Sequence, residues 1–347
     1  MRIAQPVLKV APVELEKKAP YALHPMGRSS YGGLHTGRLV LSSLPSFTAY
    51  RAKVVIGDLN DTAGKQTVAE IEAAGGTATS IKCNVVVWDD LVALFEHAIT
   101  KYQSIDIVIP NAGITDRGDF DSLVFKDGKP VEQKALAIDI NVTAVLKTVQ
   151  LAQHYMTIGQ KESDLKSIVL IGSMASWIGI PKAPLYSCSK HAILGLMRSL
   201  TKPLAFKGIR VAVIHPFFAD TNILPTAVKL FLAGIPLVPV TRVAGAIFYA
   251  ATDPDPATNG SCWLLPDDGP VFLLKKEELK LGVYEMIDSR VNAAFKGAKG
   301  AQFYIRLTKD VWRNCAPLRQ LGLVGLVGAI AWTNRTQIIG LVSQYTS

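Results

Sequence analysis

The 347-residue sequence lacks the features of a disulfide framework, a metal site or a secreted chain. Its four cysteines, Cys83, Cys188, Cys262 and Cys315, are widely spaced and form no Cys-x-x-Cys pair. Disulfide frameworks belong to short, cysteine-dense chains and zinc sites need closely spaced ligands, so we expect neither, and no metal. Residues 1–18 contain no uninterrupted apolar region, because charged residues divide them, so we expect no secretory signal there. We therefore expect reduced thiols and a cytoplasmic protein.

Long apolar runs are also lacking. The run 321–332 is apolar apart from glycine, but it is far shorter than the roughly 20 residues that cross a bilayer. Two interpretations remain open for it. It forms either a peripheral membrane contact, lying in the interface, or a tail helix packed on the body or on a second subunit.

The net charge of +9 is not spread along the chain. Residues 1–51 carry +5 and residues 275–347 carry +6, whereas residues 52–274 carry −2. A nucleic-acid-binding body needs clustered positive charge, so we expect no nucleic acid partner. The same division predicts three segments: an atypical basic N-terminal segment (1–51), a central domain (52–274) and a basic C-terminal extension (275–347).

The central domain alternates short apolar runs with helical periodicity. The predicted strands are 53–58, 78–83, 105–110, 167–172, 210–215 and 261–265, and the helices between them include 89–102, 131–155 and 185–206. Asn60 or Asp61 can cap an earlier helix, which Gly75-Gly76 ends. This alternation predicts an α/β fold: a doubly wound parallel sheet, Rossmann-like, with three αβα layers.

Polar or small residues follow several predicted strands, at the edge where such sheets bind ligands. Asp58 ends one strand, where an acid accepts hydrogen bonds from a ribose and repels a 2′-phosphate. An acid at a strand end also commonly caps the next helix. Asn111-Ala112-Gly113 ends another strand, Ser173 a third, and Pro216 and Thr221 follow a fourth. Together these ends predict a nucleotide site.

Tyr186 and Lys190 stand four residues apart in a predicted helix, so both face the same side. A phenol titrates near pH 10, and a neighbouring ammonium favours the phenolate. The pair is therefore suited to general acid–base work near neutral pH, with the Ser173 hydroxyl donating to a substrate oxygen.

From about Lys53 to Leu274 the chain resembles the short-chain dehydrogenase/reductase family. The resemblance implies a structural Asn111-Ala112-Gly113 motif, a relay asparagine (Asn141), a substrate-orienting serine (Ser173), a catalytic tyrosine (Tyr186), a ribose-binding lysine (Lys190), and a nicotinamide loop with Pro216 and Thr221. Asn84 stands where the family has an aspartate beside the adenine, and Asp58 implies NAD rather than NADP. The stretch from Trp263 to Val271 resembles the hydroxyprostaglandin-dehydrogenase-like and secondary-metabolite branch.

The family's glycine-rich turn is missing. The window 32–41 contains Thr36-Gly37 but no later glycine at the required spacing, and Val7–Val13, a candidate strand, precedes no glycine fingerprint. The first βα unit is therefore missing or irregular. Three explanations are open: a faulty translation of the gene, a divergence that disables cofactor binding, or an irregular phosphate site using Arg28, Arg38 or Arg51.

Residues 222–234 correspond to the family's substrate lid and are strongly apolar. They line a pocket for a lipophilic alcohol, or else they pack on the core or on another subunit. The sequence thus predicts an NAD(P)-dependent oxidoreductase with a hydrophobic small-molecule substrate, such as a steroid-like, terpenoid, polyketide or fatty-acid-derived alcohol, acting as a homo-oligomer. The alternative is a catalytically impaired relative that acts by binding or by membrane association.

Overall fold

A computed structural model describes residues 11–13, 52–116, 120–161, 164–219, 232–253, 255–276 and 283–314. The chain divides into two compact units, Met1–Gly282 and Val283–Ser347, each described by itself. Several of the features predicted above lie outside the described residues: the window 32–41, Arg28, Arg38, Arg51, Thr221 and the run 321–332.

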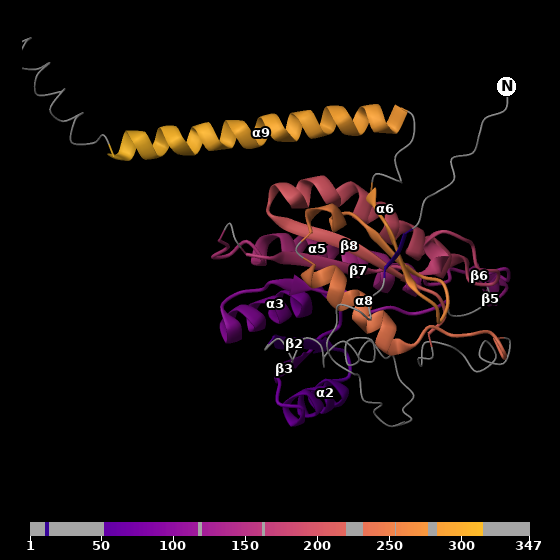
Figure 1. The fold of residues 1–347 in the computed structure, drawn as a ribbon. Coiled ribbons are helices and arrows are strands. Elements are labelled where there is room, and N and C mark those ends of the chain that lie inside the picture. The colour runs from indigo at the N-terminus through magenta and orange to yellow at the C-terminus, as the bar shows by residue number, and fades with distance from the viewer. Residues whose placement is uncertain are drawn as a thin grey trace, which may run out of the picture. The chain divides into compact units, whose positions relative to one another are not determined.

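A six-stranded sheet organises the first unit (Figure 1), and its strands follow the order β1-β10-β9-β8-β7-β4. Its strands are β1 (Ala11–Val13), β4 (Ile107–Val108), β7 (Lys166–Ile171), β8 (Ile209–Pro216), β9 (Cys262–Leu265) and β10 (Val271–Leu274). Strands β4, β7, β8 and β9 are parallel, which confirms the predicted parallel sheet. The edge differs: β10 pairs antiparallel with β9, and β1 pairs antiparallel with β10.

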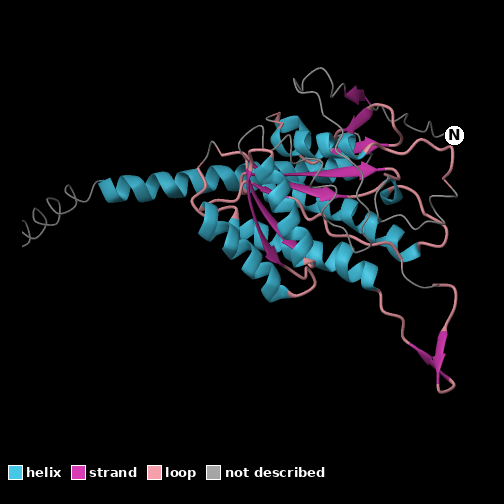
Figure 2. Ribbon diagram, turned by 90° about the horizontal axis from the view of Figure 1, so that it is seen from below, coloured by secondary structure: helices cyan, strands magenta, loops and turns pink. Residues whose placement is uncertain are grey.

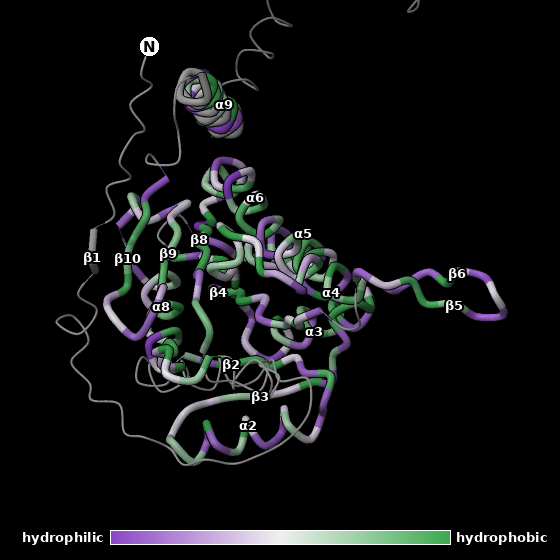
Figure 3. Tube along the Cα trace, turned by 90° about the vertical axis from the view of Figure 1, so that its right-hand side faces the viewer, coloured by the Kyte–Doolittle hydropathy of each residue, from purple (hydrophilic) through white to green (hydrophobic). Residues whose placement is uncertain are grey.

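Helices cover both faces of this sheet, which confirms the three layers (Figure 3). Successive residues of β7 point to opposite faces because a strand has a period of two. Ile168 and Leu170 accordingly join a buried cluster with α3 (Trp88–Tyr102), α5 (Ala144–Tyr155) and α6 (Pro184–Phe206). Val169 joins a second cluster with α8 (Val240–Thr252). Burial on both faces explains why β7 and β8 are almost continuously apolar.

Strands β2 (Lys53–Asp58) and β3 (Thr77–Lys82) form a separate parallel pair, covered by α2 (Asp61–Ala73). Asn60 caps α2 as predicted, since its side-chain oxygen accepts the Ala63 N–H at 3.1 Å. No strand of the described residues joins β2 to β4, where a first βα unit belongs in a doubly wound sheet. The candidate strand Val7–Val13 is described only as β1, which lies at the other edge, beside β10.

The predicted helix 131–155 begins too early. Its first residue, Val131, ends a hairpin of β5 (Val124–Lys126) and β6 (Lys129–Val131), which extends away from the sheet in Figure 2, and residues 132–135 form neither strand nor helix. The turn residues Asp127 and Gly128 both have positive φ, 52° and 73°, as a two-residue hairpin turn requires. Helix begins only at α4 (Leu136–Ile138) and continues through a π-helical turn (Asp139–Thr143) into α5.

Helix α9 (Val283–Asn314) is the described part of the second unit. It mixes charged and apolar residues along its length. Of the helices in the described ranges, none combines the length and apolar character needed to cross a membrane.

Candidate active site

The ends of β7 and β8 place Ser173 and Pro216 side by side. Ser173 is buried and begins a short 3₁₀ turn (Met174–Ser176), where its hydroxyl oxygen accepts the Ala175 N–H at 3.1 Å. The same hydroxyl lies 3.5 Å from the Pro216 carbonyl oxygen, to which it donates. The predicted serine is therefore held at the carboxyl edge of the sheet, where ligands bind in this architecture.

His215 fixes the backbone at Ser173, a role the sequence did not reveal. Its Nδ1 lies 3.0 Å from the Ser173 carbonyl oxygen, so Nδ1 carries the proton. Burial lowers the pKa of His215 to about 3, and the nearby Lys190 and Arg198 act in the same direction, against the Ser173 hydrogen bond. A Cβ at Gly172 would approach Nδ1 to 2.6 Å, so the neutral ring occupies the space that a side chain there would need.

Tyr186 and Lys190 lie on one face of α6, as their spacing predicts. The Lys190 ammonium is 5.5 Å from the centroid of the Tyr186 ring and donates to the Ile171 carbonyl at 2.9 Å. Lys190 is buried, and burial lowers its pKa to about 8. An ammonium has three N–H donors. Only one of them has a hydrogen-bond acceptor among the described residues.

The predicted lowering of the Tyr186 pKa is wrong for this structure. Burial raises the pKa of Tyr186, and a side-chain hydrogen bond with Ser173 lowers it only in part. The Lys190 ammonium, 5.5 Å from the centroid of the ring, does not reverse this effect of burial. The phenol is therefore held protonated, next to the Ser173 hydroxyl.

Asn141 connects the segment that follows β4 to α6, the helix that carries Tyr186 and Lys190. It is buried in the π-helical turn, and its side chain binds both backbone groups of Ile114 at 2.9 Å. Its amide also donates to the Ser189 hydroxyl at 2.9 Å, and that hydroxyl donates to the Tyr186 carbonyl at 2.7 Å. A Cβ at Gly113 would lie 3.3 Å from the Asn141 oxygen, so Gly113, the last residue of the Asn111-Ala112-Gly113 motif, packs closely on this amide.

Asp116 and Ser189 are site residues that the sequence analysis missed. Asp116 accepts the backbone N–H of Tyr186 at 2.6 Å and that of Leu185 at 3.0 Å. Ser189 stands inside the Tyr186–Lys190 interval, so helical spacing alone places it beside Tyr186. No comparable pattern points to Asp116, because about 70 residues separate it from its partners in the sequence.

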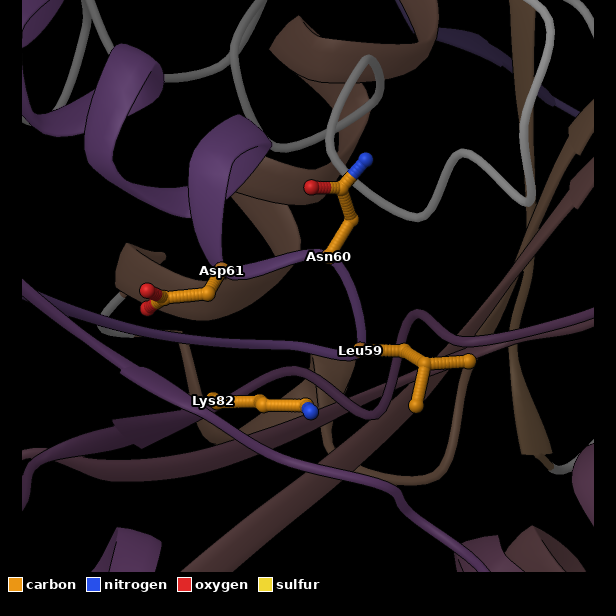
Figure 4. A pocket seen from close by; sticks show the side chains of 4 residues that line it. All are labelled: Leu59, Asn60, Asp61 and Lys82. Carbon is orange, nitrogen blue, oxygen red and sulfur yellow. The ribbon is translucent and has the colours of Figure 1, made fainter.

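Asp58 ends β2, as predicted, and is buried. Its Oδ1 accepts the Asn60 N–H at 2.8 Å, so it supports the start of α2 as well as standing at a strand end. A surface pocket of about 390 Å³ adjoins it, lined by Leu59, Asn60, Asp61 and Lys82 (Figure 4). Asn84 follows β3, and its side-chain oxygen accepts the Val86 N–H at 3.4 Å.

The described residues fit a nicotinamide dinucleotide better than a metal. The described ranges contain no group of three His, Cys, Asp or Glu side chains that could hold a metal ion. The buried Lys190 ammonium has donors left for ribose hydroxyls beside Tyr186. Asp58 stands at the end of the neighbouring strand pair, suited to a second ribose. The window where a glycine-rich turn belongs, like Thr221, falls outside the described residues.

Comparison of the chain with known proteins identifies similar dehydrogenases and reductases. Residues 45–229 match the short chain dehydrogenase family. A 3-oxoacyl-[acyl-carrier-protein] reductase of Synechocystis sp. is 32% identical over 199 residues, 56% of this chain and 76% of that protein. The short-chain dehydrogenase/reductase ascJ of Acremonium egyptiacum is 31% identical over 65% of this chain and 73% of its own length. A short chain dehydrogenase structure from Burkholderia cenocepacia, in complex with NADP, shares the fold with a TM-score of 0.56 and 23% identity, covering 67% of this chain and 92% of that one.

Proposed function

The chain belongs to the short-chain dehydrogenase/reductase family of NAD(P)-dependent oxidoreductases acting on CH–OH groups, and we propose that it interconverts a lipophilic secondary alcohol and its ketone. One observation carries the proposal. Ser173, Tyr186 and Lys190 meet at the carboxyl edge of the sheet, where the Ser173 side chain acts on the pKa of the Tyr186 phenol and the Lys190 ammonium lies 5.5 Å from the centroid of its ring.

Each residue of the site has a separate role in the proposed reaction. A bound nicotinamide cofactor supplies or accepts the hydride. Tyr186 donates a proton to the carbonyl oxygen during reduction and receives it from the alcohol during oxidation. The Ser173 hydroxyl donates a hydrogen bond to the same oxygen. Lys190 binds a ribose through its remaining N–H donors, and Asn141 keeps the end of β4 in register with α6.

The apolar sequence of residues 222–234 supports a lipophilic substrate. Leu232, the first residue described after the gap that follows Ala219, is buried. The stretch Trp263–Val271 supports assignment to the hydroxyprostaglandin-dehydrogenase-like and secondary-metabolite branch. We also propose that the chain acts as a homo-oligomer.

The test is turnover by the purified full-length chain. We expect reduced nicotinamide to form when NAD and hydrophobic secondary alcohols, including steroid-like and polyketide-derived ones, are supplied together, and polar sugar alcohols to react poorly. Cofactor binding is measured separately by quenching of protein fluorescence. A folded chain that neither binds cofactor nor turns over any alcohol would support the impaired-relative alternative.

The preference of the enzyme for NAD or NADP tests the proposed role of Asp58 at the ribose. Because its carboxylate repels a 2′-phosphate, we expect Asp58→Ser to raise kcat/KM with NADP roughly tenfold to a hundredfold and to lower it with NAD. Steady-state kinetics with both cofactors measure this ratio. Asp164→Ser is a suitable control, because it removes a half-buried carboxylate whose described partner is the Lys161 N–H at 2.9 Å. An unchanged NADP/NAD ratio in Asp58→Ser would contradict the assignment.

The pH dependence should differ between the two directions. Burial raises the pKa of Tyr186, so the phenol is protonated at neutral pH. Reduction uses the protonated form, whereas oxidation needs the phenolate. We therefore expect kcat for alcohol oxidation to rise from about pH 7 to about pH 10 while ketone reduction stays level or falls. Parallel pH profiles in the two directions would argue against Tyr186 as the proton carrier.

A further inference from the structure

The helix that carries the candidate catalytic residues has no cap of its own. Ala183 occupies the N-cap position of α6 and offers no side-chain acceptor, and Pro184 follows at the first helical position. Proline lacks an N–H, so the first-turn donors that need an acceptor include those of Leu185 and Tyr186. Tyr186, the residue whose phenol reaches Ser173, therefore stands in the first turn, where helices fray most readily.

Asp116 supplies the missing cap from a different part of the chain. One carboxylate oxygen accepts the Tyr186 N–H at 2.6 Å, and the other accepts the Leu185 N–H at 3.0 Å. Hydrogen bonds from N–H groups to a carboxylate are shorter and stronger than neutral ones, and negative charge is favoured at a helix N-terminus. The contact therefore anchors the backbone of Tyr186 itself.

Asp116 is in turn held in place. Two residues earlier, both backbone groups of Ile114 bind the Asn141 side chain at 2.9 Å. Asn141 donates to Ser189, and Ser189 donates to the Tyr186 carbonyl. The contacts close a ring that runs from Asn141 through the segment 114–116 to Tyr186 and back through Ser189. The N–H of Tyr186 is thus linked to Asn141 through Asp116 and the segment 114–116, and its carbonyl is linked to Asn141 through Ser189.

We infer that Asp116 is a positioning residue for the reaction: by capping α6 at Leu185 and Tyr186, it sets the location of the Tyr186 phenol relative to Ser173. It acts through the backbone of Tyr186 rather than on the reacting atoms. The inference rests on the proposed function, in which Tyr186 carries the proton. Small displacements of a proton-transfer group have large effects on rate, so a cap at this residue affects catalysis more than a cap elsewhere.

The test compares Asp116→Ala with Asp116→Asn in the full-length chain. We expect kcat to fall about tenfold in Asp116→Ala, with the KM for NAD within about twofold of the original, because the chemical step loses its geometry while the cofactor contacts remain. The alkaline limb of the oxidation profile should shift, since the environment of the phenol changes. Asp116→Asn keeps one acceptor and should recover part of kcat.

Asp255→Ala is the matched control. Asp255 is also a carboxylate that accepts a backbone N–H, that of Ala257 at 2.9 Å, but it caps a 3₁₀ turn (Pro256–Thr258) near the start of β8, away from the carboxyl edge. We expect it to lose stability without losing kcat. If Asp116→Ala keeps the original kcat and pH profile, or if Asp255→Ala loses kcat equally, the inference is overturned.

Hydrogen–deuterium exchange separates this inference from the proposed function. The amides of Leu185 and Tyr186 should exchange faster in Asp116→Ala and remain protected in Asp255→Ala. Faster exchange of these two amides supports the positioning contact even if the chain shows no turnover. Absence of turnover would count against the proposed function but not against the contact. Unchanged exchange at both amides in Asp116→Ala would overturn the contact.

Discussion

Tyr186→Phe should lower kcat by roughly a thousandfold, because general acid–base catalysis by one positioned group contributes about 10² to 10⁴. The phenol hydroxyl is the only group removed, and the ring still packs beneath the Lys190 ammonium. Cofactor affinity, measured by fluorescence titration, should therefore change little. Loss of rate with retained binding distinguishes a proton carrier from a structural tyrosine.

Tyr155→Phe provides the comparison. Tyr155 is also partly buried, but its ring stacks on Phe95 at 5.3 Å between centroids, in the cluster between α3 and α5. We expect removal of its hydroxyl to leave kcat within about a factor of two. Equal losses in the two variants would mean that the Tyr186 effect arises from packing, and turnover that survives Tyr186→Phe would assign the proton transfer elsewhere.

Lys190→Met should weaken cofactor binding and lower kcat/KM by roughly a hundredfold, since hydrogen bonds to charged groups contribute about 1.5–3 kcal/mol. Lys147→Met is a close control. Lys147 lies on α5, is half-buried and, like Lys190, donates to a backbone oxygen, the Val86 carbonyl at 3.1 Å. Isothermal titration with NAD should show a loss in the first variant alone. Equal affinities would exclude Lys190 from the ribose site.

The lowered pKa of Lys190 also makes the stability of the folded chain depend on pH. Its pKa falls from an ordinary lysine value of 10.5 to about 8 in the folded chain, because burial disfavours the ammonium. Between these values the unfolded chain binds a proton that the folded chain does not, so the Lys190 contribution to stability rises with pH across this window, by roughly 3 kcal/mol at most. Burial raises the pKa of Tyr186, Cys83 and Cys262, which lowers stability over the alkaline part of the same range. The Lys190 contribution is therefore measured as a difference: between about pH 7.5 and about pH 10, the change in the free energy of unfolding in urea should be more positive in the original chain than in Lys190→Met.

Local sequence patterns were sufficient for most of the fold. The strand 53–58 and the cap at Asn60 agree with β2 and the start of α2, because a short apolar run and a side-chain cap depend on near neighbours. The hairpin at Asp127-Gly128 was missed, although that dipeptide favours a two-residue turn. The predicted helix 131–155 therefore begins at Val131, the last residue of the second strand, five residues before α4. The antiparallel edge strands depend on pairing between distant segments, which periodicity does not report.

The candidate site divides in the same way. The spacing of Tyr186 and Lys190 placed both side chains on one helix face, and the structure brings them to Ser173. The direction of the Tyr186 pKa was wrong, because burial outweighs the neighbouring ammonium and burial is a property of the folded chain. Asp116 and His215 act on backbone groups of residues far away in the sequence, so no local pattern could identify them.

The π-helical turn Asp139–Thr143 has a consequence for how this chain tolerates deletions. A π-turn holds more residues than an α-turn, so shortening it by one residue would restore a continuous α-helix from α4 into α5. That helix would be locally more regular. The residues before the deletion would nevertheless be rotated relative to α5, and Asn141 would lose its register with Ile114 and Ser189. A shortened chain could thus gain helical regularity and lose the alignment of its active site.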